Sequence, residues 1–385
     1  MLAFKVKFEV ITPVHIGSGE EYYPVDYVID DNDKKLYMID ENKLLNSVEK
    51  EGKLNEFTRL TSTYTQTNTA LLDFIRKRAK GNHKYTVDVE GSALDYIEKE
   101  GAFRAPISRF IRNRYDNRVY IPGSTIKGAI RSAFAEMVMN RIEKKYEIKN
   151  RKKALERFKK DFGLDPCYGI ETFLNTSGNP KDAKNDVMRY FKVSDFTAVK
   201  TVEKIYKVFA VKRPAEDGTR TVQNIPDILE SVGRGSVFEG TIEVDNRFLN
   251  EMNVALNRFA LEAIKSIKAN NIALWIRNFY RVKAYGVEKE AFLWDSDAKF
   301  FGSNEYIKYE SVFRRFGKSF RYPTEPKNGF MIKIGKHGGA VSKTIDGCRE
   351  IKIKGKNRPQ EKQTTLWLAG GYPMGWVKGK VEEVK

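Results

Sequence analysis

The sequence has little cysteine and no long apolar run, and both absences restrict the classes of protein it can belong to. Its two cysteines, Cys167 and Cys348, stand apart without a CxxC pattern, so we expect neither a disulfide framework nor a structural zinc site. No stretch approaches the roughly 18 apolar residues of a membrane-spanning helix, and residues 1–10 alternate like a strand rather than forming a signal peptide. We therefore expect a cytoplasmic protein that does not contact a membrane.

The glycine patterns of nucleotide-binding folds are also absent, and histidine is scarce. No GxGxxG occurs, and Gly128 is followed by Ala129 and Ile130 instead of the Lys-Ser/Thr of a phosphate-binding P-loop. Only three histidines occur among 385 residues, His15, His83 and His337. The sequence therefore predicts no dinucleotide fold, no P-loop NTPase, no cofactor and no metal site.

Acidic residues are outnumbered by basic ones, which predicts a polyanionic partner. Lys and Arg total 69 against 51 Asp and Glu, giving a formal net charge of +18. The excess is concentrated in residues 104–131, where Asp116 is the one acidic residue and three aromatic residues are interleaved. Because cations hold phosphates while aromatic rings stack on bases, this stretch favours nucleic acid over a solvated charged face. The cations are Arg104, Arg109, Arg112, Arg114, Arg118, Lys127 and Arg131, and the aromatic residues are Phe110, Tyr115 and Tyr120.

Residues 121–134, IPGSTIKGAIRSAF, combine a glycine turn, two hydroxyls and two cations at the expected start of a helix. We expect Ser124 or Thr125 to cap the helix, leaving its first backbone N–H groups free to bind an anion. Lys127 and Arg131 are spaced i, i+4 and share one face of this helix. An amphipathic helix with a solvated basic face is the alternative, and spacing alone leaves both open.

Alternation of polar and apolar residues predicts a mixed α+β chain of two domains, residues 1–189 and 190–385. Strand, helix and strand patterns occur twice, which points to two ferredoxin-like domains with helical insertions and glycine-rich loops. The expected strands are 4–12, 25–30, 35–39, 191–196, 205–211 and 236–245. The expected helices lie within 41–80 around an exposed connection at 61–69, and at 150–161 and 249–268, while residues 212–225 form a projecting loop.

Four glycine-containing segments together resemble one family. TPVHIGSG at 12–19, IPGSTIKGAIRSAF at 121–134, IGKHGG at 334–339 and GGYPMGWV at 370–377 are similar to the repeat-associated mysterious proteins (RAMP) of CRISPR systems. Their order is most similar to the fifth subunits of type III-A (Csm) interference complexes. The resemblance implies ferredoxin-like folds and an RNA-binding subunit that caps the 3′ end of the guide (crRNA) and assists its maturation in antiviral defence. The partners it implies are crRNA, target RNA, the other subunits of the effector complex and a host trimming nuclease.

We predict that the subunit holds RNA and is not an enzyme, with no catalytic residue. The candidate RNA-binding residues are His15, Gly17, Ser18, Arg109, Arg112, Arg114, Gly123, Ser124, Thr125, Lys127, Arg131, Lys333, Lys336 and His337.

Two other function classes stay open from the sequence. One is a RAMP-type endoribonuclease that processes or cleaves RNA, through a metal bound at Asp217 in the projecting loop or through His15 beside Gly17 and Ser18. A solvated turn at Asp217 and a hydrogen-bonded turn histidine at position 15 are the commoner structures for such residues. The other is a single-strand RNA-binding protein that acts outside any complex.

Overall fold

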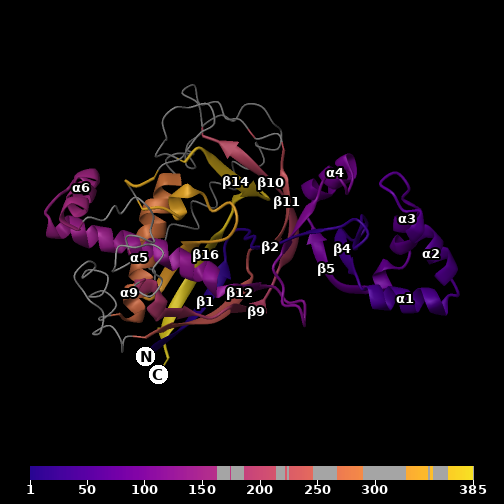
Figure 1. Ribbon diagram of the computed structural model, residues 1–385, viewed down its shortest axis with the longest axis horizontal. Coiled ribbons are helices and arrows are strands. Elements are labelled where there is room, and N and C mark those ends of the chain that lie inside the picture. Colours follow the sequence, from indigo (N-terminus) through magenta and orange to yellow (C-terminus); the bar gives the residue numbers. More distant parts are fainter. Residues whose placement is uncertain are drawn as a thin grey trace.

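The protein is built from two β-sheets covered by helices, as seen in a computed structural model (Figure 1). In both sheets the order of the strands differs from their order in the sequence. The structure describes residues 1–162, 174, 186–213, 222, 225–245, 267–288, 327–345, 347–349 and 363–384. Across these residues no helix combines the length and apolar character needed to cross a bilayer. Cys348 is disulfide-bonded, contrary to the expectation from the isolated cysteines.

The first sheet joins the two ends of the sequence. Its order is β13-β16-β1-β12-β9-β7, with β8 also paired to β12, and every pairing is antiparallel. Along β1, Phe4, Val6, Phe8 and Val10 are buried while Lys5 and Lys7 are exposed, as expected for a sheet with one face on the core. The strands are β1 (Leu2–Val10), β7 (Tyr120–Ile121), β8 (Phe191–Val193), β9 (Phe196–Lys200), β12 (Val237–Val244), β13 (Gly329–Lys333) and β16 (Trp376–Glu383).

Two helices cover the buried face of this sheet. Helix α5 (Gly123–Lys145) and helix α9 (Ala269–Arg277) pack against each other and against the strands (Figure 1). The Phe134 and Trp275 rings meet in edge contact at 5.2 Å between their centroids. A β-α-β-β-α-β series runs through this sheet in chain order, formed by β1, α5, β9, β12, α9 and β16. The four strands of the series lie in the spatial order β16-β1-β12-β9. Helix α6 (Arg151–Phe162) follows α5, as the sequence predicts. Short helical turns follow at η3 (Val187–Tyr190), η5 (Asn278–Tyr285) and η6 (Ala340–Ser342).

The second sheet is mixed and has the order β2-β6-β11-β10-β5-β4-β3, with β14 paired to β10 and to β15. β10 runs parallel to β5, and β11 runs parallel to β6. The hairpin β3–β4 agrees with the predicted strands at 25–30 and 35–39. The strands are β2 (Gly17–Tyr22), β3 (Tyr27–Asp30), β4 (Lys35–Ile39), β5 (His83–Val89), β6 (Ile107–Phe110), β10 (Glu203–Lys212), β11 (Asp227–Val232), β14 (Thr365–Ala369) and β15 (Tyr372–Pro373).

A helical lobe lies beside β3, β4 and β5, away from α5 and α9 (Figure 1). It holds α1 (Glu41–Lys50), α2 (Leu54–Ser62), α3 (Ala70–Arg76) and the turn η1 (Ala79–Gly81), which bury their own apolar cluster against the hairpin. Asp40 caps α1 by accepting a hydrogen bond from the Lys43 N–H at 3.2 Å. Helix α4 (Gly91–Glu100) packs on β10. The predicted helices within 41–80 and their exposed connection are therefore confirmed.

The expected boundary between residues 189 and 190 does not separate the sheets. Both sheets take strands from each side of it, because β1 pairs with β12 and β16 while β5 and β6 pair with β10 and β11. The predicted helix at 249–268 and most of the predicted loop at 212–225, including Glu216 and Asp217, lie outside the described residues.

Candidate nucleic-acid interface

Three of the glycine-containing segments are joined directly by backbone hydrogen bonds. The Lys336 N–H donates to the His15 carbonyl at 2.8 Å, and the Ile334 N–H donates to the Gly375 carbonyl at 2.9 Å. The Gly375 N–H in turn donates to the Pro13 carbonyl at 2.8 Å. Segments 12–19, 334–339 and 370–377, far apart in the sequence, therefore form one rigid surface.

The glycines in these segments are required by this packing. Gly335 has φ +84°, and a Cβ there would lie 2.4 Å from the His15 carbonyl oxygen. Gly375 has φ +99°, and its Cβ would lie 2.6 Å from the Ile334 carbonyl oxygen. Since both the backbone angle and the close approach exclude a side chain, these two glycines bring protein backbones together. Glycine at these two positions is therefore required by contacts within the protein.

A pocket of about 470 Å³ lies where this surface meets the fourth segment, at the start of α5. Its rim includes the exposed residues Gly17, Ser124, Lys336 and Lys343. No carboxylate is among the described residues that line it. The lining residues are Ile16, Gly17, Ser124, Thr125, Gly128, Ala129, Arg131, Ser132, Tyr280, Lys333, Ile334, Gly335, Lys336, Gly338, Ser342 and Lys343.

Arg131 supplies the pocket with hydrogen-bond donors that the protein does not use. Its Nη1 lies 2.6 Å from Asp186, whereas its Nε and Nη2 are buried and have no partner among the described residues. An unpaired buried donor is costly, and a guanidinium presents its donors in a planar fork that matches a phosphate. Two donors without a described protein partner, beside a pocket that has no described carboxylate, are compatible with an anionic ligand there.

The start of α5 differs from the expectation. The N-cap residue is Pro122, and neither Ser124 nor Thr125 caps the helix. The Gly123 N–H donates to the Asp195 carboxylate at 2.8 Å, so the protein's own anion occupies the first donor of the helix. A Cβ at Gly123 would lie 2.2 Å from the Val193 carbonyl oxygen, which explains why glycine stands there.

Lys127 is half-buried on the same helix and is not among the residues that line the pocket. Burial lowers its pKa. A direct RNA contact by Lys127 stays a prediction.

Lys333 was expected to line the RNA channel, but its ammonium group is buried. Lys333 Nζ lies 2.5 Å from Glu288 Oε1, and both side chains are 1% exposed or less. Burial lowers the pKa of Lys333 and raises that of Glu288, while their mutual attraction opposes both shifts. Because Lys333 has a dedicated carboxylate partner inside the protein, we assign it to the core and not to the RNA-contacting surface.

Lys336 and His337 share one carboxylate. Asp227 lies 3.0 Å from Lys336 Nζ and 2.9 Å from His337 Nε2, and these two contacts hold its pKa at about 2. The His337 ring also stacks on Trp367 at 3.8 Å between ring centroids. Lys336 remains exposed at the pocket rim, whereas the half-buried His337 does not line the pocket.

His15 is a buried, hydrogen-bonded residue. Its Nδ1–H donates to the Glu230 carbonyl at 2.6 Å, and 1% of the residue is exposed. Burial lowers its pKa to about 4. A neutral histidine held in this way is suited to positioning the loop and poorly suited to touching an RNA phosphate.

We expect the protein to lose stability as the pH falls from about 6.5 to about 4, because of His15. The folded state favours neutral His15, so in this range the unfolded chain binds the additional proton. The shift from 6.5 to about 4 corresponds to about 3 kcal/mol of unfolding free energy. Urea unfolding measured across this range tests it. His15→Gln, which keeps a donor for the Glu230 carbonyl, should make the unfolding free energy depend less on pH. An equal pH dependence in wild type and variant would contradict the assignment of this effect to His15.

A second, larger pocket adjoins the first at residues 17 and 18. Gly17 lines the first pocket and Ser18 lines the second, which measures about 620 Å³. Arg114 and Tyr115 project at its rim, and Tyr115 is 97% exposed. The remaining lining residues are Glu20, Arg109, Phe110, Ile111, Arg112, Asn113, Asn117, Tyr120, Asp195 and Thr197. The two pockets are lined by neighbouring residues of segments 16–18 and 120–125, and we refer to the surface lined by both as the groove.

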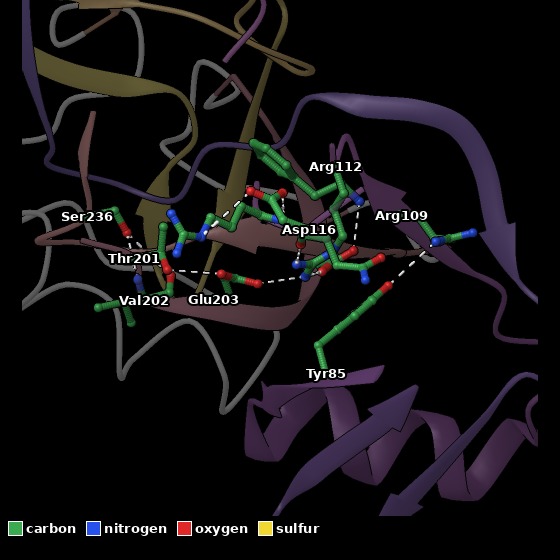
Figure 2. A network of polar contacts seen from close by, with 12 residues as sticks. Tyr85, Arg109, Arg112, Asp116, Thr201, Val202, Glu203 and Ser236 are labelled. Carbon is green, nitrogen blue, oxygen red and sulfur yellow. Dashed lines mark hydrogen bonds and ion pairs between the residues drawn. The ribbon is translucent and has the colours of Figure 1, made fainter. Parts of the chain in front are cut away.

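Arg112, in the wall of this groove, is neutralised by carboxylates from two distant strands (Figure 2). Its Nη2 lies 2.6 Å from Glu203 of β10 and also contacts Glu230 of β11. Burial alone would lower the pKa of Arg112, but Glu230 and Glu203 raise it above its usual value. Glu230 also accepts from Tyr22 and from the Phe110 N–H. Arg112 is therefore part of the buried network beneath the groove.

Neither carboxylate of this network, Glu203 or Glu230, was predicted from the sequence. Glu230 stands in the largely buried strand Asp227–Val232 and is 0% exposed. An acidic residue at the buried centre of a strand is a signal for an internal ion pair, since carboxylates are rarely buried unless paired. Arg109, by contrast, lies at the surface of the groove, where it pairs with Glu20 at 2.9 Å and reaches Tyr85 (Figure 2).

Across the described residues, no group of three or more histidine, cysteine, aspartate or glutamate side chains is placed to hold a metal ion. The loop carrying Asp217 lies outside that part of the chain. The described residues that line the groove include arginines, lysines, hydroxyls and aromatic rings, together with the carboxylates of Glu20 and Asp195.

A family model described as the RAMP superfamily matches residues 7–318. The chain belongs to the RAMP superfamily. Among curated proteins, this RAMP chain is similar to "CRISPR system Cms protein Csm5" of Methanocaldococcus jannaschii, with 26% identity over 258 residues, 66% of this chain and 56% of that protein. It is also similar to the protein of the same name from Streptococcus thermophilus, with 29% identity over 136 residues, 34% of this chain and 37% of that protein. The matches thus span about half of these relatives' lengths or less.

Two solved structures share the fold of this RAMP chain. One is described as a "Cryo-EM structure of Csm-crRNA-target RNA ternary complex in type III-A CRISPR-Cas system", with a TM-score of 0.67, 20% identity and coverage of 98% of this chain and 100% of that one. The other is a "Crystal structure of T.onnurineus Csm5", with a TM-score of 0.62, 21% identity and coverage of 96% and 99%. The mixed α/β arrangement is therefore a RAMP fold over nearly its whole length.

Proposed function

We propose that this RAMP protein is an RNA-binding subunit of a type III-A CRISPR interference complex, that it caps the 3′ end of crRNA and that it assists crRNA maturation. The observation that carries the proposal is the pair of unused, buried Arg131 donors in a pocket lined by three of the four glycine-containing segments and by no described carboxylate. The names of the similar proteins and the shared fold support the same function.

The groove is suited to holding the RNA backbone with little regard to sequence. Arg131, Lys336 and Lys343 surround the first pocket, and the exposed Arg114 and Tyr115 lie at the rim of the second. Phosphate contacts position a nucleic acid without reading its bases, while an aromatic ring offers a stacking surface to any base. We therefore propose crRNA and its target RNA as ligands, and the other effector subunits as neighbours on the protein surface.

We also propose that the fold consists of two ferredoxin-like domains. The β-α-β-β-α-β series of the first sheet, with the order β16-β1-β12-β9, supports a ferredoxin-like domain assembled from both ends of the sequence. We propose a second such domain around the second sheet. A cytoplasmic location, a noncatalytic role and recruitment of a trimming nuclease complete the proposal.

Arg131→Ala is expected to lower the affinity for single-stranded RNA by about tenfold or more, equally for all sequences, because it removes charge-assisted hydrogen bonds to phosphate. Lys343→Ala is expected to have a smaller effect in the same direction. The slope of log affinity against log salt should fall by roughly 0.7 for each phosphate that the variant no longer binds. Filter binding of end-labelled RNA by the full-length protein at several salt concentrations measures both quantities.

Lys99→Ala is the matched control, because Lys99 is exposed on α4 and does not line either pocket. Unchanged binding by Arg131→Ala would remove the first pocket from the RNA site. The same samples, with magnesium and with EDTA, should show binding without cleavage. Cleavage that depends on magnesium and on Asp217 would establish the ribonuclease alternative instead.

A further inference from the structure

A third pocket, of about 520 Å³, lies between the helical lobe and the hairpin β3–β4. Its floor is apolar, formed by Met38, Ile39, Leu44, Leu71 and Ile75, all of which are at most 8% exposed. Aromatic side chains, Phe57, Tyr64 and Tyr85, form part of its wall. The volume is within the range of about 300–1,000 Å³ in which proteins hold small ligands, and aromatic walls suit a planar one.

Hydroxyl and carboxylate groups line the rest of this pocket, among them Tyr64, Asp26 and the exposed Glu41. The Tyr64 hydroxyl is buried and has no hydrogen-bond partner among the described residues. Asp26 also lines the pocket and is half-buried, and burial raises its pKa. A buried hydroxyl without a partner is unfavourable unless a ligand satisfies it. The pocket therefore offers the unpaired Tyr64 hydroxyl and the carboxylates of Asp26 and Glu41 to the edge of a ligand.

The pocket opens onto the basic groove. Arg109 and Asn117 line both this pocket and the 620 Å³ pocket of the groove. The Arg109 Nη2 reaches the Tyr85 hydroxyl at 3.5 Å (Figure 2). The Arg109 guanidinium lies over the Tyr22 ring, 5.1 Å from the ring centroid, and its Nε is buried without a partner among the described residues. Lys84 is exposed at the pocket rim. A strand whose phosphates follow the groove would pass the mouth of this pocket.

We propose that this pocket binds one unstacked nucleobase of the RNA strand held in the groove. The base stacks against the aromatic wall, the Tyr64 hydroxyl hydrogen-bonds to its edge, and the Asp26 carboxylate accepts from its exocyclic amino group. Bases splayed from single-stranded RNA are recognised in this way, and a carboxylate accepts from the N4 amino group of cytosine. Uracil has no amino group, so the pocket favours cytosine over uracil. This inference rests on the proposed RNA-binding function and adds a base preference to it.

The test measures binding of oligo(C) and oligo(U) of equal length to the full-length protein and to single variants. Wild type is expected to bind oligo(C) several-fold more tightly, and Asp26→Asn should abolish the difference. Tyr64→Phe should weaken oligo(C) binding by about threefold to tenfold, the effect of one hydrogen bond, without lowering thermal stability. Thr61→Trp places a ring into the pocket from its exposed rim and should weaken binding by about 5- to 100-fold, as expected when one stacked base is displaced.

Tyr27→Phe is the matched control, because the Tyr27 hydroxyl is also buried without a partner among the described residues but does not line the pocket. It should leave binding of both RNAs unchanged. Arg131→Ala should weaken oligo(C) and oligo(U) equally and so preserve their ratio. Wild-type affinity and an unchanged ratio in both Tyr64→Phe and Thr61→Trp would overturn the pocket assignment while leaving the groove intact. Absence of RNA binding by wild type would instead overturn the proposed function and this inference together.

Discussion

Arg112→Met is expected to lower the free energy of unfolding by about 3–5 kcal/mol, because it leaves a buried carboxylate without its cation. Glu230 is 0% exposed and lies beneath the groove, where it has no access to bulk solvent. Tyr22 and the Phe110 N–H would still donate to it, but neither carries a compensating charge. Urea unfolding followed by circular dichroism measures the loss.

Arg114→Met is the matched control for Arg112. Arg114 is exposed two residues further along the same segment, so its replacement should change the unfolding free energy by no more than about 0.5 kcal/mol. Equal losses in the two variants would mean that the Arg112 network is not what stabilises this part of the fold.

Lys333→Met is also expected to lower the free energy of unfolding by about 3–5 kcal/mol, because it leaves the buried Glu288 carboxylate without its cation. The sequence predicted an RNA contact for Lys333, so the two assignments make different predictions. If Lys333 belongs to the core, Lys333→Met should lower the free energy of unfolding, and the folded variant should bind RNA with an unchanged salt dependence. A phosphate contact would flatten the salt slope and leave stability unaffected.

The double variant Lys333→Met with Glu288→Gln separates the effect of the charge pair from the effect of packing. Glutamine retains an oxygen that can accept from Gln363, which lies 3.4 Å from Glu288 Oε1, but it carries no charge. The double variant should therefore recover more than half of the stability that Lys333→Met loses. A double variant as unstable as the single one would attribute the loss to packing around Trp376 and not to the isolated carboxylate.

The sequence predicted the parts of the fold that depend on local patterns. Period-2 alternation located β1 and the β3–β4 hairpin, and apolar spacing located the helix after Pro122. Of the candidate RNA-binding residues, Gly17, Ser124, Thr125, Arg131 and Lys336 line one pocket. A direct contact between these residues and RNA stays a prediction.

The charge partners could not be predicted, because they are brought together by strand pairing and not by spacing. Arg112 meets carboxylates 91 and 118 residues away, on β10 and β11. Lys333 ends a strand whose residues are all buried, so its side chain enters the core beside Glu288. A run of cations in the sequence therefore overstates the charge of the surface, since Arg112 is neutralised internally by residues outside the run.

The position of β1 in the first sheet has a consequence for synthesis of the protein. β1 is hydrogen-bonded on one side to residues 237–244 and on the other to residues 376–383. At about 5–20 residues per second, tens of seconds separate the emergence of β1 from the ribosome and that of β16. During that interval the nascent chain carries Phe4, Val6, Phe8 and Val10 on a strand with an unpaired edge. This sheet is therefore completed only after residues 376–383 have been synthesised, and until then one edge of β1 stays open to pairing with other strands.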